Sequence, residues 1–250
     1  MHARLGAAPV VADFAASVQT LVLGLYIGGS LATGDYRPAV SDIDAVALVE
    51  RAPSPAVRAA LQEIHQGLAH QAECANRLHC VYVPLGHVSD VARRHWTWAF
   101  GEFFRRHLSG IARAELLSDP IVMLGPAPAT WLTPMSVDEL QEAARSELSG
   151  YWSRALQKKA IWLEDVYVDI GLTVWARAAA TIEDGVLITK SRAIAGMSER
   201  GVPLEIVDGI THRRCGTQTA PLSEEQRRHR ATYVRTFLKT EIDRLLWLPA

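Results

Sequence analysis

The sequence predicts an α+β protein of two domains, in which an N-terminal α/β domain is followed by an all-helical domain. Three observations lead to this prediction. Helix and strand patterns alternate over the first third of the chain, a turn-rich stretch occupies residues 124–134, and helical patterns dominate from residue 136 onward. We therefore expect domains at residues 1–134 and 135–250.

The N-terminal elements follow an order typical of an α/β core. An amphipathic helix, at about residues 10–23, leads into a short apolar strand at Leu25–Ile27. A loop rich in Gly, Pro and Asp comes next, and a second strand is expected at Asp42–Val49. A helix bounded by Pro55 and a third strand at His79–Val83 complete the pattern.

The rest of the chain carries signals of linker and helices. The turn-rich stretch 124–134 is the expected linker, and Ser136 with Glu139 forms a capping box directly after it. Ser223 with Gln226 forms a second capping box before the final helix. Apolar residues at helical spacing predict two stripes, which consist of Val166, Ile170, Val174 and Ala178, and of Val234, Leu238, Ile242 and Leu245.

The composition excludes several classes of protein but indicates no particular reaction. With 49% hydrophobic residues and a net charge of -1, the chain is not disordered, and we do not expect a nucleic-acid partner. No apolar run reaches the roughly 20 residues of a spanning helix, and Asp13 interrupts the segment that a secretory signal would need. Cys74, Cys80 and Cys215 cannot all pair and have no metal-ligand spacing. We expect a cytoplasmic monomer with no membrane partner.

The loop between the first two strands carries the chemistry. Gly28, Gly29 and Ser30 follow the first strand, and Asp42 and Asp44 stand at the head of the second, on one face because the side-chain period of a strand is two. Adjacent carboxylates suit Mg²⁺, which also takes phosphate oxygens, while glycines let backbone amides approach a phosphate. Each motif alone is more often a plain turn or a solvated strand end. Their combination before an apolar strand predicts a site for a nucleoside triphosphate bound through its metal.

These residues resemble a known family. The run GGSLATGDYRPAVSDIDAVALV is similar to the nucleotidyltransferase motif of the DNA polymerase β-type superfamily, and more narrowly to that of the aminoglycoside adenylyltransferases that inactivate streptomycin and spectinomycin. Residues 99–108 resemble the family's Phe-Gly-Glu-Trp segment beside the drug site, with Phe103 at the Trp position. Residues 117–128 resemble the run out of its first domain. The resemblance implies a nucleotidyltransferase domain with a mixed sheet flanked by helices, followed by a helical domain that binds substrate and nucleotide.

The resemblance also implies a reaction, the transfer of AMP from ATP to a hydroxyl of an aminoglycoside or similar small molecule. Asp42 and Asp44 would hold Mg²⁺, and Gly29 and Ser30 would bind the β- and γ-phosphates. In the helical domain, Arg177 and Lys190 have the spacing of the Arg and Lys that the family uses on ATP phosphates. Without that spacing, a pair of solvated helix-face charges would be the favoured interpretation of these two residues.

A cationic acceptor calls for acidic and apolar contacts. Glu102, Phe103, Asp165 and Asp169 are the expected acceptor-binding residues, near a cleft predicted between the domains. The alternative for Asp165 and Asp169 is the solvated face of an amphipathic helix.

One residue departs from the family pattern. The family uses a Glu on the neighbouring strand as the base for the attacking hydroxyl, whereas here His79 stands at or next to that position, and no acid occurs between Glu73 and Asp90. A neutral imidazole can itself act as the base, so His79 is a candidate catalytic residue. Alternatively, the protein is a nucleotide-binding pseudoenzyme or sensor, or transfers the nucleotide to a different acceptor, such as a protein or tRNA.

Overall fold

The computed structural model describes residues 2–217 and 220–247. The chain divides into two compact units, Met1–Met135 and Ser136–Ala250, and each is described here by itself. The predicted fold class is confirmed, because the first unit is built on a mixed sheet with helices and the second unit is helical.

The sheet of the first unit has six strands in the order β5-β4-β3-β2-β1-β6. Neighbouring strands are antiparallel except β2 and β3, which are parallel. The strands are β1 (Gly24–Ile27), β2 (Ile43–Val49), β3 (Leu78–Pro84), β4 (Arg94–Ala99), β5 (Glu102–His107) and β6 (Ile121–Leu124). The sequence predicted β1, β2 and β3 to within a residue or two, and it did not predict the hairpin β4–β5 or β6.

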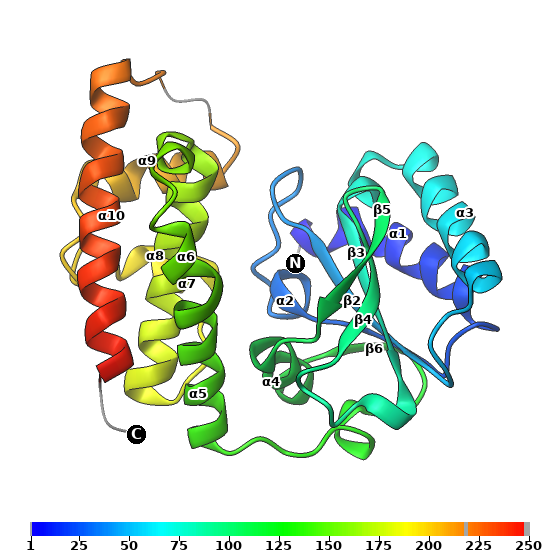
Figure 1. Cartoon of the computed structure of the whole chain (residues 1–250). Coiled ribbons are helices and arrows are strands. Elements are labelled where there is room, and N and C mark those ends of the chain that lie inside the picture. The colour runs from blue at the N-terminus through cyan, green and yellow to red at the C-terminus, as the bar shows by residue number, and fades with distance from the viewer. Residues whose placement is uncertain (1, 218–219, 248–250) are drawn as a thin grey trace. The chain divides into compact units, whose positions relative to one another are not determined.

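Alternation along the strands divides the core of this unit into two layers. Ile43 and Ala45 of β2 face the layer that contains α1 (His2–Val18) and α3 (Pro55–Gln71), while Val46 faces α4 (Gly110–Ser118) on the other side. Figure 1 shows α1 and α3 on one side of the sheet and α4 on the other. Helix α1 begins at His2, eight residues before the expected start at about residue 10, and it ends at Val18 instead of at about residue 23. A one-turn helix, α2 (Gly29–Ala32), interrupts the loop after β1.

The stretch expected to be a linker packs onto the first unit. Trp131 Nε1 donates a hydrogen bond of 3.1 Å to Tyr26 Oη, which in turn donates to the Pro126 carbonyl at 2.8 Å. Leu132 is buried in the layer that faces α4. Turn residues therefore marked a change of structure here, but aromatic and apolar side chains bind the segment to the sheet.

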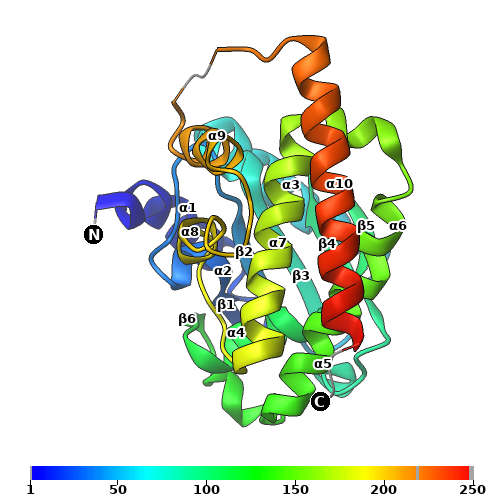
Figure 2. The same ribbon diagram turned by 90° about the vertical axis from the view of Figure 1, so that its left-hand side faces the viewer.

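The second unit consists of helices joined by short turns. Its elements are α5 (Val137–Glu147), a π-helical turn (Leu148–Trp152), α6 (Ser153–Ala155), a 3₁₀ turn (Lys159–Leu163), α7 (Asp165–Asp184), α8 (Lys190–Ala195), α9 (Leu204–Arg214) and α10 (Glu224–Trp247). Helices α7 and α10 pack side by side (Figure 2). Both capping boxes form as predicted, Ser136 with Glu139 and Ser223 with Gln226.

The two predicted apolar stripes have different outcomes. On α10 the predicted residues are buried, which confirms that stripe. On α7, Val166 and Ile170 are 54% and 48% exposed, whereas Val168 and Leu172 are buried, so the stripe is displaced by two positions in its first half. Helix α7 contacts α5, α8 and α10, and a helix covered on several sides has no single stripe for periodicity to identify.

In the described ranges, no helix is long and apolar enough to cross a membrane. Within the described residues, Cys74, Cys80 and Cys215 form no disulfide.

Candidate functional site

The head of β2 brings Asp44 against the glycines that follow β1. The Gly28 amide donates a hydrogen bond of 2.9 Å to the Asp44 carbonyl. Gly29 has φ +59°, and a Cβ at this position would lie 2.5 Å from Asp44 Oδ2. Position 29 therefore requires glycine for two reasons, its backbone conformation and the close approach of the Asp44 carboxylate.

His79 lies beside the carboxylates of Asp42 and Asp44. The parallel register of β2 and β3 pairs it with Asp44, so both side chains share one face of the sheet. His79 Nδ1 is 3.9 Å from Asp42 Oδ2, and the residue is only 6% exposed. The structure thus brings together Asp42, Asp44 and His79, three residues that the sequence proposed as catalytic.

Ser30 is carried by α2, next to Gly29. The Ser30 carbonyl accepts a 2.8 Å hydrogen bond from the Asp35 amide, and the Gly29 carbonyl accepts one from the Thr33 amide at 3.1 Å. These bonds hold the Gly-Gly-Ser segment in a defined turn beside the Asp44 carboxylate.

Two residues near the carboxylates were missed in the sequence. Arg77 Nη1 lies 3.9 Å from Asp42 Oδ1 and donates to the Val40 carbonyl. Arg77 ends the 3₁₀ turn Glu73–Arg77 directly before β3, and its place two residues before His79 was a usable signal. Phe100 lies in the β4–β5 turn, where its ring centroid is 4.7 Å from that of His79 although 77% of the residue is exposed. No pattern in the sequence indicated this contact.

Phe100 and Gly101 adopt φ values of +55° and +81° in a two-residue hairpin turn. Such turns normally place Asn or Gly where Phe100 stands, because a bulky residue is strained in the left-handed region. The turn sets the register of β5, which pairs Glu102 with Ala99 and Phe103 with Trp98.

That register separates the two acceptor residues predicted on β5. Glu102 is exposed on the sheet face that carries Asp44. The Phe103 ring packs in the opposite layer, 5.2 Å from the Trp98 ring and 5.9 Å from that of Tyr82. Phe103 is therefore partly buried against the core, on the opposite face of the sheet from Asp44, and this placement does not support its expected contact with an acceptor.

The two acids predicted on α7 are engaged in ion pairs within the helical unit. Asp169 accepts two hydrogen bonds from Arg213, at 2.8 and 2.6 Å, and Asp165 accepts one from Arg230. The hydrogen bonds to Asp169 raise the pKa of the Arg213 guanidinium. Burial raises the pKa of the Asp169 carboxyl. The expectation that these acids face a cationic acceptor is corrected, since arginines from α9 and α10 already neutralise them.

Arg177 and Lys190 both belong to the region where α7 is followed by α8. Arg177 Nε donates a 2.9 Å hydrogen bond to the Ile188 carbonyl, and exposed Lys190 begins α8 two residues later. The structure thus holds the Arg177 side chain close to the segment that carries Lys190.

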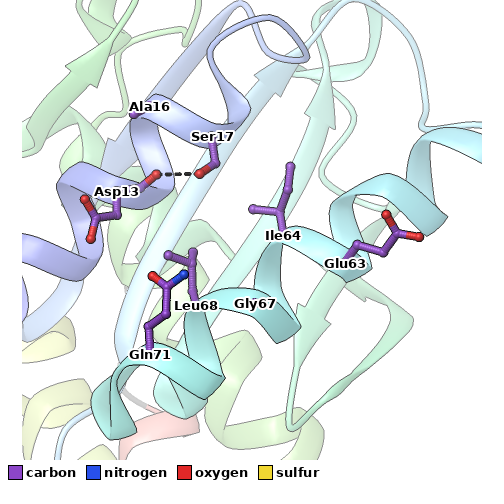
Figure 3. Close-up of a pocket in the computed structure, with 8 residues that line it drawn as sticks. All are labelled: Asp13, Ala16, Ser17, Glu63, Ile64, Gly67, Leu68 and Gln71. Atoms are coloured by element: carbon purple, nitrogen blue, oxygen red, sulfur yellow. Dashed lines mark hydrogen bonds between the residues drawn. The ribbon is translucent and has the colours of Figure 1, made fainter.

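The larger hollow found in the structure is not at the carboxylates. An open groove of about 400 Å³ lies between α1 and α3, with Asp13, Ser17, Glu63, Ile64 and Gln71 among its lining residues (Figure 3). Since these helices cover the opposite face of the sheet from Asp44, this groove is separate from the candidate site.

The donor set fits Mg²⁺ that arrives with a nucleotide. Among the residues that the structure describes, no group of three or more His, Cys, Asp or Glu side chains is arranged to hold a metal ion. Asp42 and Asp44 supply two carboxylates, and Mg²⁺ is commonly bound by one or two carboxylates together with water and substrate phosphates. A binding site completed by phosphate oxygens is consistent with this donor set.

Comparisons with known proteins agree with this geometry. Residues 11–75 match the family model of the nucleotidyltransferase domain, a segment that contains Gly29, Ser30, Asp42 and Asp44. No protein of curated function matches the chain in sequence. Among solved structures, the chain is similar to spectinomycin adenyltransferase AAD(9) from Enterococcus faecialis, crystallised with ATP and spectinomycin. That match has a TM-score of 0.66 and 14% identity, and covers 93% of this chain and 98% of the other. Residues 11–75 are therefore similar to a nucleotidyltransferase domain, and the chain shares its fold with this adenyltransferase.

Proposed function

We propose that this protein is an adenylyltransferase that transfers AMP from ATP to a hydroxyl group of a small molecule, of the aminoglycoside type. One observation carries the proposal: Asp44 shares a sheet face with His79 and abuts Gly29, and Asp42 Oδ2 lies 3.9 Å from His79 Nδ1. The nucleotidyltransferase match of residues 11–75 and the adenyltransferase fold support it.

In this mechanism the acceptor hydroxyl attacks the α-phosphorus of ATP and pyrophosphate leaves. Asp42 and Asp44 would hold Mg²⁺, which when bound neutralises charge that develops on the phosphoryl oxygens. The amides of the glycine turn and the Ser30 hydroxyl would bind the β- and γ-phosphates. Arg177 and Lys190 of the helical unit are proposed to add positive charge to the triphosphate.

His79 would accept the proton of the attacking hydroxyl through an imidazole nitrogen. Its ring is covered by Phe100 and lies near Asp42, which limits how the imidazole can turn. A general base needs such a fixed orientation within reach of the proton that it removes.

The residues expected to bind the acceptor differ in their surroundings. Of the four residues expected to bind a cationic acceptor, Glu102 alone remains exposed on the face of Asp44. Phe103 packs against the core, and the two acids on α7 pair with arginines.

An acceptor screen tests the proposal directly. The full chain is incubated with Mg²⁺, ATP labelled on the α-phosphate and a panel of aminoglycosides, neutral hydroxylated compounds and tRNA. We expect label to appear on a small-molecule acceptor together with release of pyrophosphate, and neither product with Asp42→Asn. Equal labelling by wild type and this variant would refute the assigned site.

A second function is favoured by one residue, because His79 stands where related enzymes carry a carboxylate. In this case the protein binds the nucleotide and acts as a sensor, without efficient transfer. His79→Glu would then create or raise transfer, whereas a fall in transfer would support His79 as the working base. Binding of ATP should persist in both cases.

A further inference from the structure

A small cavity in the helical unit lies apart from all residues assigned above. It has a volume of about 130 Å³, roughly that of four water molecules in the liquid. Its described lining residues come from the π-helical turn, α6, the 3₁₀ turn and α7, and are Tyr151, Arg154, Ala155, Lys158, Ile161 and Tyr167. Two side chains are cationic, two are phenols, and none in this set is acidic.

The two cations have no carboxylate partner. Within residues 2–217 and 220–247, neither Arg154 nor Lys158 forms an ion pair or a side-chain hydrogen bond. The acids that follow in the sequence, Asp165 and Asp169, are bound by arginines of α9 and α10. Two like charges beside one cavity repel each other, so an anion placed between them would be favoured.

The phenols add hydrogen-bond donors. Partial burial, together with the neighbouring Tyr167 phenol, raises the pKa of the Tyr151 hydroxyl, which therefore stays protonated at neutral pH. Tyr151 also belongs to a π-helical turn, an irregularity that occurs frequently at functional sites.

The backbone that carries the cations is held in place. Fully buried Trp162 donates through Nε1 to the Ala155 carbonyl at 3.0 Å. Arg235 donates two hydrogen bonds, of 3.0 and 2.9 Å, to the Leu156 carbonyl. Ala155 and Leu156 lie between Arg154 and Lys158, so Trp162 and Arg235 together fix the backbone of this short segment. The cavity is therefore formed before any ligand binds.

We propose that this cavity binds the phosphate group of a small molecule. A phosphate monoester carries about 1.5 to 2 negative charges at neutral pH, which matches one Arg and one Lys, and its oxygens can accept hydrogen bonds from both phenols. Ile161 and Ala155 provide an apolar wall for the carbon atoms next to the ester. The site goes beyond the proposed nucleotidyl transfer and does not depend on it.

Titration calorimetry of the full chain with inorganic phosphate, at constant ionic strength, tests the proposal. We expect Arg154→Gln/Lys158→Gln to weaken binding by at least about tenfold, since each charged hydrogen bond contributes about 1.5–3 kcal/mol. Tyr151→Phe should weaken it by a smaller factor. The matched control is Lys159→Gln, which removes an adjacent exposed charge that does not line the cavity.

Four results would overturn the proposal. Three are undetectable phosphate binding by the wild type, unchanged affinity in the double variant, or an equal loss in the Lys159→Gln control. The fourth is acetate binding as tight as phosphate, which would reject a phosphate site in favour of a carboxylate site. Circular dichroism and thermal melting of each variant test whether the fold is intact, and we expect it to be, because all four substituted side chains are exposed.

Discussion

The acidic residues of the two units differ in how closely they are paired with cationic side chains. In the first unit, Asp42 and Asp44 stand at the head of β2. Among the described residues, Asp42 forms ion pairs only with Arg77 and His79, at 3.9 Å each. In the helical unit, Asp169 is bound by Arg213 at 2.6 and 2.8 Å, and Glu183 by Arg200 and Arg244 at 2.7 and 2.8 Å. Removing one partner of a tightly paired acid leaves a charge without compensation, whereas a loosely paired acid keeps its oxygens available to a cation. The comparison is consistent with the functional role proposed for Asp42 and Asp44 and with a structural role for Asp169 and Glu183.

The largest effect expected from this comparison is on activity. Asp44→Asn should lower the rate of pyrophosphate release by about a thousandfold or more, because it removes one of two proposed metal-binding carboxylates. Its thermal stability should be nearly unchanged, since Asp44 is exposed. Asp13→Asn, an exposed acid on α1 in the groove of Figure 3, is the control and should keep wild-type rates. Retention of activity within tenfold in Asp44→Asn would remove the functional half of the comparison.

The reciprocal change should act on stability. Asp169→Ala should lower the free energy of unfolding of the helical unit by about 2–3 kcal/mol, because Arg213 loses the carboxylate that accepts its two hydrogen bonds and keeps only the 3.7 Å contact with Asp165. Asp243→Ala removes an exposed pair with Lys239 and should cost below about 0.5 kcal/mol. Denaturant titration measures both values. Equal losses in the two variants would mean that the Asp169 pair is no more structural than a surface pair.

Acid should destabilise the first unit through His65. This residue is 2% exposed, its Nε2 lies 2.8 Å from Tyr82 Oη, and burial lowers the pKa of its imidazole from 6.5 to about 3. Between these values the unfolded chain binds a proton that the folded chain does not. Its contribution to stability is therefore complete above the unfolded pKa and is lost as pH falls toward the folded one.

From neutral pH to about pH 5, this group should cost the fold about 2 kcal/mol. Denaturant titrations at the two pH values should show a loss smaller by that amount in His65→Gln than in the wild type. His70→Gln, an exposed histidine on the same helix, should retain the full loss. An unchanged pH dependence in His65→Gln would show that His65 does not cause it.

The smallest effect on stability is expected at Gly29. Gly29→Ala should cost about 1–2 kcal/mol, because alanine is strained at φ +59° and its Cβ would displace the Asp44 carboxylate. Gly86→Ala, at a position where a Cβ meets no atom within 4 Å, should change stability by less than about 0.5 kcal/mol. Melting curves compare the two. If Gly29→Ala is as stable as Gly86→Ala, the close approach of Asp44 to the glycine turn is incorrect.

Local patterns predicted the features that depend on short-range geometry. Strand alternation placed Asp42 and Asp44 together, and both capping boxes formed as expected. The stripe on α10 was correct because that helix buries one side. The same approach misplaced half of the stripe on α7, since α7 is covered from several sides and its buried positions are set by three neighbouring helices.

The sequence by itself determined the order of the elements through β3, the glycine turn and the carboxylates at the head of β2, since each depends on residues close together in the chain. Tertiary structure decided which acids remain available, because Arg213 is 44 residues from Asp169 and Arg230 is 65 residues from Asp165. It also decided that Phe103 faces the core, through the register of a hairpin whose turn holds Phe100 in a conformation unusual for its type. Pairing between distant segments depends on packing of the whole unit, which local periodicity does not encode.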